Sequence, residues 1–398
     1  MIKKLVSGCL ILLSAGMALA QSDGGIEFSG SGFLTLAAGK VFKGDAPQDF
    51  NGYHAPMFAS DWGQGGIYER GHWTLNPDSK LGLQGTATFN PRVSVTGQVV
   101  SRGTSNGKFD LEWAYLNYTI DDRWTFQLGR KRLPLFYYSE TQDVGLAYPW
   151  VHLPSGQYGW EIVNYNGANL LYHDQWGSWS SSMNFFAGDE TRKNSPYETT
   201  TNGKHSHTDD RWSNIVGADM TLTRGWFEAR LAYIQSDDQD RFEDPLAPPP
   251  FDYSPKARQK IYALSFAVDH HSWVVRNEYL YMDRKQKGEE DYSFLLGAGY
   301  RIGKYLPMLT YNRYWMRLKP GLANPAVVDP STIDPLSAER WTTLAFSLRY
   351  DLTPTSALKM QIERWKDQNG PNFNLDASGK SIPYGNARLF SLSYDRVF

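Results

Sequence analysis

The sequence predicts an all-β fold, a transmembrane antiparallel β-barrel of sixteen strands with short turns at one end and long loops at the other. Three observations lead to this prediction. Apolar and polar residues alternate in many short segments, the links between these segments sort into short and long ones, and the last segment ends in an aromatic residue. Only a closed barrel lets half-polar strands cross a bilayer with every backbone hydrogen bond satisfied.

The N-terminus predicts a secretory signal peptide over residues 1–20. Two lysines precede an apolar run from Leu5 to Met17, and a small-x-small cleavage site ends at Ala20. We expect residues 21–398 to form a single barrel domain. The one cysteine, Cys9, would leave with the signal peptide, which excludes disulfides and cysteine metal sites from the mature protein.

Composition narrows the class further. The 40 basic residues nearly balance the 42 acidic ones, so nothing indicates a nucleic-acid partner. After the signal peptide no apolar run is long enough for a membrane-spanning helix. Aromatic residues make up 15% of the chain, and the aromatic girdles at the two lipid interfaces of a barrel would use many of them.

The alternating segments are the predicted strands. We place them at 26–38, 80–89, 92–102, 110–120, 123–131, 167–174, 178–187, 213–223, 225–235, 259–270, 272–284, 292–302, 305–317, 341–351, 357–365 and 387–398. In the last of them, apolar Phe390, Leu392, Tyr394 and Phe398 alternate with small polar residues. Because a strand sends alternate side chains to opposite faces, one face would contact lipid and the other water.

The links between the segments alternate strictly between short and long. The long ones are 39–79, 103–109, 132–166, 188–212, 236–258, 285–291, 318–340 and 366–386. This sorting is typical of outer-membrane barrels, which have short periplasmic turns and long outer loops. A charged side chain at the middle of the bilayer costs about 2–4 kcal/mol, so the charged parity must face the lumen. A sixteen-stranded barrel is too wide for side chains to fill and leaves an aqueous channel.

The third long link, residues 132–166, is the most informative one. It is rather apolar and aromatic for an exposed loop, and a loop of this length is usually functional. We therefore expect it to fold inward and pack on the barrel wall.

In this link the chain resembles the Gram-negative porin family. The resemblance is carried by the Gly129–Pro134 run, the Ser139–Trp150 stretch and the terminal Phe398. It implies an integral outer-membrane homotrimer and a passive diffusion channel for small hydrophilic solutes and ions, with no enzymatic activity, cofactor or metal. The third loop would form its constriction. Implied partners are outer-membrane lipid, lipopolysaccharide and the barrel-assembly machinery, which would read Phe398 as an assembly signal.

The same resemblance implies the constriction residues. Glu140 and Asp143 on the loop would face basic residues across a narrow pore. The candidate basic residues are Lys131, Arg132, Arg92, Arg102, Arg230, Arg276, Arg301, Arg349 and Lys359. Opposed charges would set up a transverse field that orders polar solutes, since charged rings select ions in pores. The alternative interpretation is that these charges merely solvate a water-filled wall or form structural ion pairs.

Other functions stay open or are disfavoured. A substrate-specific channel for sugars, phosphate or organic acids is the main alternative, with Trp113, Tyr115 and Phe186 as a possible aromatic track. No Gly-x-Ser-x-Gly elbow indicates a hydrolase. We interpret His205 and His207 as part of a solvated loop and not as a metal site.

Overall fold

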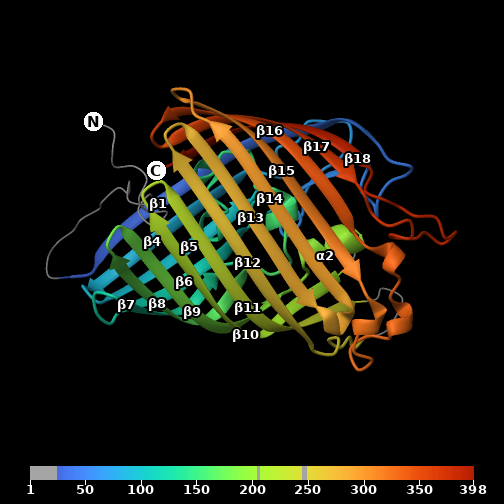
Figure 1. The fold of residues 1–398 in the computed structure, drawn as a ribbon, viewed down its shortest axis with the longest axis horizontal. Coiled ribbons are helices and arrows are strands. Elements are labelled where there is room, and N and C mark those ends of the chain that lie inside the picture. Colours follow the sequence, from blue (N-terminus) through green and yellow to red (C-terminus); the bar gives the residue numbers. More distant parts are fainter. Residues whose placement is uncertain (1–24, 204–206, 244–248) are drawn as a thin grey trace.

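The computed structural model describes residues 25–203, 207–243 and 249–398, and there the chain forms one closed barrel (Figure 1). Sixteen antiparallel strands close because β1 pairs with β18 along one edge and with β4 along the other. The predicted signal peptide, residues 1–20, lies outside the described residues. Within the described ranges we find no helix with the length and apolar character needed to cross a membrane.

The barrel strands are β1 (Glu27–Asp45), β4 (Lys80–Asn90), β5 (Val93–Arg102), β6 (Phe109–Thr119), β7 (Trp124–Arg132), β8 (Asn164–Trp176), β9 (Trp179–Arg192), β10 (His207–Arg224), β11 (Phe227–Glu243), β12 (Ala257–His270), β13 (Trp273–Arg284), β14 (Glu289–Tyr300), β15 (Tyr305–Leu318), β16 (Arg340–Thr353), β17 (Ser356–Asp367) and β18 (Asn386–Val397). The links contain β2 (Phe58–Asp61), β3 (Gly66–Tyr68), α1 (Ser155–Tyr158), α2 (Pro196–Asn202) and the 3-10 turns η1 (Gly103–Ser105), η2 (Ser139–Thr141), η3 (Gly145–Ala147), η4 (Lys285–Lys287), η5 (Pro320–Leu322), η6 (Pro330–Thr332) and η7 (Pro335–Ser337).

Every predicted strand is confirmed, and so is the alternation of short and long links. The largest differences are at β1, β10 and β11, which extend beyond the predicted 26–38, 213–223 and 225–235 toward the long loops. The ladder between β10 and β11 continues through pairs such as Asp209 with Arg241. Apart from Trp212 and Phe242, the extensions of β10 and β11 are polar on both faces, so they lack the alternation from which strands were predicted.

The two faces of the wall have opposite character. Large apolar side chains remain exposed on the outer face, among them Leu128 at 53%, Leu231 at 56% and Leu309 at 56%. The inward parity is polar and covered, for example Gln98, Ser265 and Gln361. An exposed apolar belt of this extent is the surface expected against lipid acyl chains.

Two strands with aromatic residues on both parities have separate explanations. In β6 a register shift lies between Val99–Leu111 and Gln98–Trp113, so Glu112 is an extra residue and the inward parity changes there. In β15 the inner face is covered by the third long loop, since Trp150 Nε1 donates to Thr310 Oγ1 at 2.8 Å. The apolar inward residues of β15 therefore pack against protein and not against water.

Two long links fold into the lumen (Figure 1). We call residues 46–79 loop 1 and residues 133–163 loop 3. Loop 3 was predicted to fold inward, and the structure confirms it. Loop 1 was not: its β2–β3 hairpin lies inside the barrel with Phe58, Trp62 and Tyr68 almost fully buried. The lumen thus contains a hydrophobic core of its own, built from both loops and the inner wall.

Candidate functional site

Loop 3 lies inside the lumen and is fixed by charged residues of several wall strands. Near its origin, Asp143 accepts from Arg102 at 2.8 Å and contacts Arg132. Glu112 on β6 completes this network, 2.7 Å from Arg102 and 3.1 Å from Arg132. Burial alone would raise the pKa of Asp143, but Arg102 and Arg132 outweigh it and hold that pKa well below its ordinary value. Asp143 is therefore a carboxylate in a buried ion network.

Three residues earlier in loop 3, Glu140 binds Arg230 of β11. The guanidinium donates to both carboxylate oxygens, at 2.8 and 3.0 Å, and also to the Phe136 carbonyl at 2.9 Å. Asp219 lies 3.2 Å from the same guanidinium. Burial raises the pKa of Glu140, yet Arg230 outweighs it, so the pKa is lowered. The Glu140 side chain is 46% exposed and so borders the open part of the lumen.

Three more of the candidate basic residues hold the loop through its carbonyl or hydroxyl oxygens. Lys359 donates to the carbonyls of Gly145 and Trp150 at 2.5 and 2.7 Å. Arg349 donates to the Leu146 carbonyl at 2.6 Å, and Arg276 to the Tyr138 hydroxyl at 2.8 Å. These contacts bind loop 3 to β13, β16 and β17. The Lys131 ammonium donates to the Gln127 side-chain oxygen and lies 4.8 Å from the centre of the Tyr115 ring.

The structure corrects two residues of the predicted set. Arg92 is exposed in the tight turn between β4 and β5, and Arg301 is exposed after β14, where it pairs with Asp351 at 2.7 Å. Both lie at the short-turn end, because each marks the edge of a tight turn, and neither reaches loop 3. A further correction concerns the separation between the acidic and the basic side chains. The loop acids were expected to face basic residues across the pore, but Glu140 and Asp143 are in direct contact with them.

A buried triad of His152, Asp78 and Glu363 was missed. His152 Nδ1 lies 3.0 Å from Asp78 of loop 1, and its Nε2 lies 2.7 Å from Glu363 of β17. Burial would lower the pKa of His152, but the carboxylates of Glu363 and Asp78 outweigh it and raise the pKa to about 10. The charged imidazolium thus joins loop 1, loop 3 and the wall. The three residues are far apart in the sequence. The only signal for the triad was the parity of Glu363, which places its side chain on the inward face of its strand.

The hairpin of loop 1 was also missed. Trp62 lies against Trp341, Trp365 and Tyr384 of the wall and the last loop, with ring centroids 5.1–6.1 Å apart. A Cβ at Gly63 would collide with the carbonyl oxygen of Trp160 in loop 3. The hairpin is therefore packed directly on loop 3. The available signal was the glycine-rich turn 62–66 between Phe58 and Tyr68, which is typical of a hairpin.

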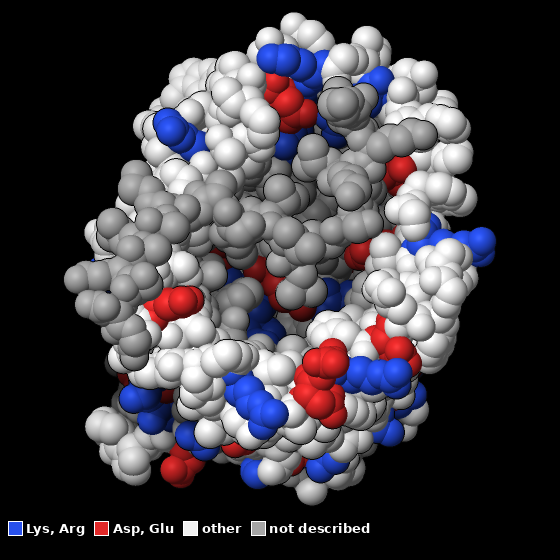
Figure 2. All heavy atoms as spheres, turned by 90° about the vertical axis from the view of Figure 1, so that its left-hand side faces the viewer, with Lys and Arg blue, Asp and Glu red and all other residues white. Residues whose placement is uncertain are grey.

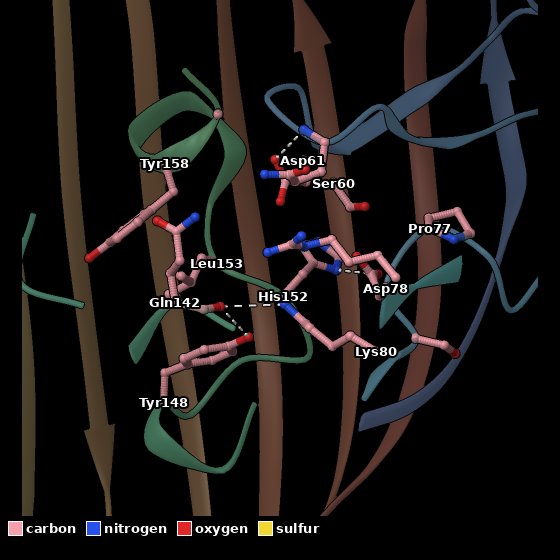
Figure 3. Close-up of a pocket in the computed structure, with 14 residues that line it drawn as sticks. Ser60, Asp61, Pro77, Asp78, Lys80, Gln142, Tyr148, His152, Leu153 and Tyr158 are labelled. Atoms are coloured by element: carbon pink, nitrogen blue, oxygen red, sulfur yellow. Dashed lines mark hydrogen bonds and ion pairs between the residues drawn. The ribbon is translucent and has the colours of Figure 1, made fainter. Parts of the chain in front are cut away.

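A cavity of about 30 Å³ lies between the two loops and the wall (Figure 3). Asp61 and Gln64 line it from the hairpin, Gln142 from loop 3, and Lys80 and Arg102 from β4 and β5. Burial raises the pKa of Asp61, and Lys80 and Arg102 only partly oppose this. Seen from the end at which β18 finishes, the barrel is hollowed, and both acidic and basic side chains lie in the hollow (Figure 2). In the ranges that the structure describes, no group of His, Cys, Asp and Glu could hold a metal ion, and His205 lies outside those ranges.

Comparison with known proteins decides the family. The family model for Gram-negative porins matches residues 8–370 of the chain. The chain belongs to the Gram-negative porin family. It is an integral protein of the Gram-negative outer membrane and a diffusion channel, as the closed barrel and the family together indicate. No match was found among curated protein sequences.

Solved structures share the porin fold at low sequence identity. The outer-membrane channel DcaP of Acinetobacter baumannii has a TM-score of 0.56 and 15% identity, over 96% of this chain and 100% of that one. The anion-selective porin from Comamonas acidovorans has a TM-score of 0.52 and 11% identity, over 94% and 100%. OmpT of Vibrio cholerae, in its trimer form, has a TM-score of 0.51 and 10% identity, over 94% and 100%.

Proposed function

We propose that the passage through this porin is limited by loop 3 and the loop 1 hairpin together, and that it admits small hydrophilic solutes and ions without reacting with them. One observation carries the proposal. The cavity between the two loops has a volume of about 30 Å³ and polar walls. This volume suits roughly two water molecules, so solutes would pass with most of their hydration shell replaced by protein groups.

The charges around this cavity support a transverse field. Asp61 on the hairpin faces the cationic side formed by Lys80 and Arg102. Arg102 is held by short ion pairs with Asp143 and Glu112. Lys80 makes longer and weaker contacts, at 3.9 Å to Asp143 and 3.4 Å to the Gln142 carbonyl. Lys80 and Asp61 are therefore the charges most available to a passing ion.

Reversal potentials under a salt gradient test this assignment. Asp61→Asn removes the acidic side and is expected to shift selectivity toward anions, while Lys80→Gln is expected to shift it toward cations. Arg92→Gln, in an exposed turn, is the matched control and should leave the reversal potential unchanged. Wild-type selectivity in both cavity variants would contradict the proposed constriction.

We further propose that the protein is a homotrimer, surrounded by outer-membrane lipid and lipopolysaccharide and inserted by the barrel-assembly machinery. The trimer form of the similar OmpT supports the oligomeric state. Phe398 supports the assembly signal, because it directly follows the closing strand β18 and its amide donates to the Gly32 carbonyl at 2.9 Å.

A further inference from the structure

Several carboxylates meet inside the barrel, where β10 and β11 approach the long loops. We call them the acidic cluster: Glu161 of loop 3, Glu198 of α2, Asp210 of β10, and Asp238 and Asp240 of β11. Each acts electrostatically on another member, so the five side chains are neighbours. The cluster opens to solvent through Asp240, whose side chain is 44% exposed. None of the five lines the cavity between loop 1 and loop 3.

Two cations neutralise part of the acidic cluster. Arg284 of β13 forms an ion pair with Glu161. Lys287 of η4 lies 2.7 Å from Asp238 and 3.2 Å from Asp240. Both cations are therefore already bound, and Asp210 takes no part in these pairs.

Asp210 is the buried carboxylate of the cluster that lacks a counter-ion. It is 3% exposed, and its Oδ2 has no hydrogen-bond partner. Its cross-strand neighbours are Asp240, which carries a like charge, and Arg192 of β9. The Arg192 guanidinium donates instead to Gln64 Oε1 of the loop 1 hairpin, at 2.8 Å. In the described ranges Asp210 forms no ion pair within 4.0 Å, and a buried carboxylate without a partner is unfavourable.

The side chains around Asp210 are suited to an ammonium group. The Ser195 hydroxyl lies beside it, is fully buried and has no hydrogen-bond partner either. From α2, the Glu198 carboxylate acts on Asp210 as well. Burial and the carboxylates of Glu161 and Asp240 raise the pKa of Glu198 to about 7, which shows that negative charge accumulates here. A primary ammonium has three donors and no acceptor, so two carboxylates and a hydroxyl oxygen would satisfy it.

An organic ammonium fits this place better than a metal ion. Within the part of the chain that the structure describes, no group of His, Cys, Asp and Glu has an arrangement that could hold a metal. Charge-assisted hydrogen bonds from N–H donors need no such arrangement of several ligands around one centre.

We propose that the acidic cluster binds the primary ammonium group of small organic cations, with Asp210, Glu198 and Ser195 as the acceptors. Such a solute would be held at the long-loop end before it reaches the passage between loop 1 and loop 3. The proposal rests on the proposed function, because it concerns solutes that diffuse through this channel.

Ligand-observed NMR with n-butylammonium tests the proposal on the full-length protein in detergent. We expect saturable binding at millimolar concentrations, with roughly tenfold weaker binding to the nearly isosteric Asp210→Asn and severalfold weaker binding to Glu198→Gln. Glu243→Gln is the matched control. It removes a carboxylate from the same end of β11, where Glu243 lies 3.6 Å from Arg241 and outside the cluster, and it should bind like wild type.

Tetramethylammonium tests whether the site recognises N–H donors or charge alone. It has the same charge but no N–H group, so it should bind wild type roughly tenfold more weakly than n-butylammonium. Equal binding of the two cations would overturn the proposal. So would wild-type affinity for n-butylammonium in Glu198→Gln, a variant whose side chain is only partly buried and which decides the matter if Asp210→Asn does not fold.

Single-channel recording in potassium chloride separates this site from the channel itself. n-Butylammonium should reduce the potassium current of wild type more than that of Asp210→Asn, while the two conduct equally without the amine. Normal potassium conductance without amine binding would overturn the ammonium site and leave the proposed function intact. Amine binding by a folded protein that conducts no potassium would support the site and contradict the proposed function.

Discussion

Single charged residues in this porin act mainly by fixing loop 3. Asp143 shows this most clearly, since it is 6% exposed and contacts two guanidinium groups. Removing one partner of a buried ion pair usually costs about 3–5 kcal/mol, because the remaining charge stays buried.

The substitution Asp143→Asn should therefore lower the free energy of unfolding by about 3 kcal/mol. It leaves Arg132 with Glu112, and Arg102 with Glu112 and the more exposed Asp110, as carboxylate partners. Denaturant titration in detergent measures the change. Glu140→Gln is the comparison: its side chain is 46% exposed, so solvent screens the pair and a loss of only about 1 kcal/mol is expected. Equal effects of the two substitutions would argue against a buried network.

The His152 triad predicts a loss of stability at alkaline pH. The pKa of His152 is raised from 6.5 to about 10, so its contribution is complete below about 6.5 and declines as pH rises toward 10. The pKa of Asp78 is lowered, despite burial, by His152, so its contribution disappears only in acid. The denaturation midpoint of wild type should fall between neutral pH and pH 10. In His152→Gln this slope should be much shallower; an identical slope would exclude the triad.

For single residues, the sequence predicted which basic side chains lie near loop 3 better than it predicted the role of each one. Arg102, Arg132, Arg230, Arg349 and Lys359 do meet loop 3, because inward parity can be read from the alternation. These residues contact the loop directly and do not face it across water. This contact depends on the path of loop 3, and the loop sequence has no regular repeat from which its path can be predicted. Arg92 and Arg301 were misplaced because parity gives the face of a strand but not the height along the barrel.

Among the elements, the strands were predictable and the inward hairpin was not. Lipid on one side and water on the other impose a repeat of two on every strand, and tight turns separate them. The hairpin of loop 1 packs on protein on both faces, so its residues carry no such repeat. Its role as part of the constriction comes from the three-dimensional structure.

The hairpin leads to a prediction about conductance. Gly63→Val would place a side chain against the Trp160 carbonyl and push the hairpin away from loop 3. The channel should then become noisier and conduct more. Gly85→Val is the matched control, because a Cβ at Gly85 meets no atom within 4 Å. An increase in conductance in the Gly85→Val control, or no increase in Gly63→Val, would contradict the contact between the two loops.

The whole molecule is a barrel closed by its own ends. Phe398 pairs with Gly32, so the final strand completes the wall beside the first one. If Phe398 is also read during assembly, Phe398→Ala should reduce the amount of folded protein in the outer membrane severalfold. The unfolding free energy of the purified variant should change little, because the Phe398 side chain is 45% exposed. A large loss of stability in vitro would instead indicate a structural role.

The central claim is that the polar lumen is an open passage, narrowed by loop 1 and loop 3 together. Single-channel recording in planar bilayers tests it most directly, with wild type beside a variant in which residues 58–68 are replaced by a short glycine linker. The account predicts small stepwise conductances for wild type and clearly larger steps for the variant. Folded wild-type protein that does not conduct, or a variant with unchanged steps, would contradict it.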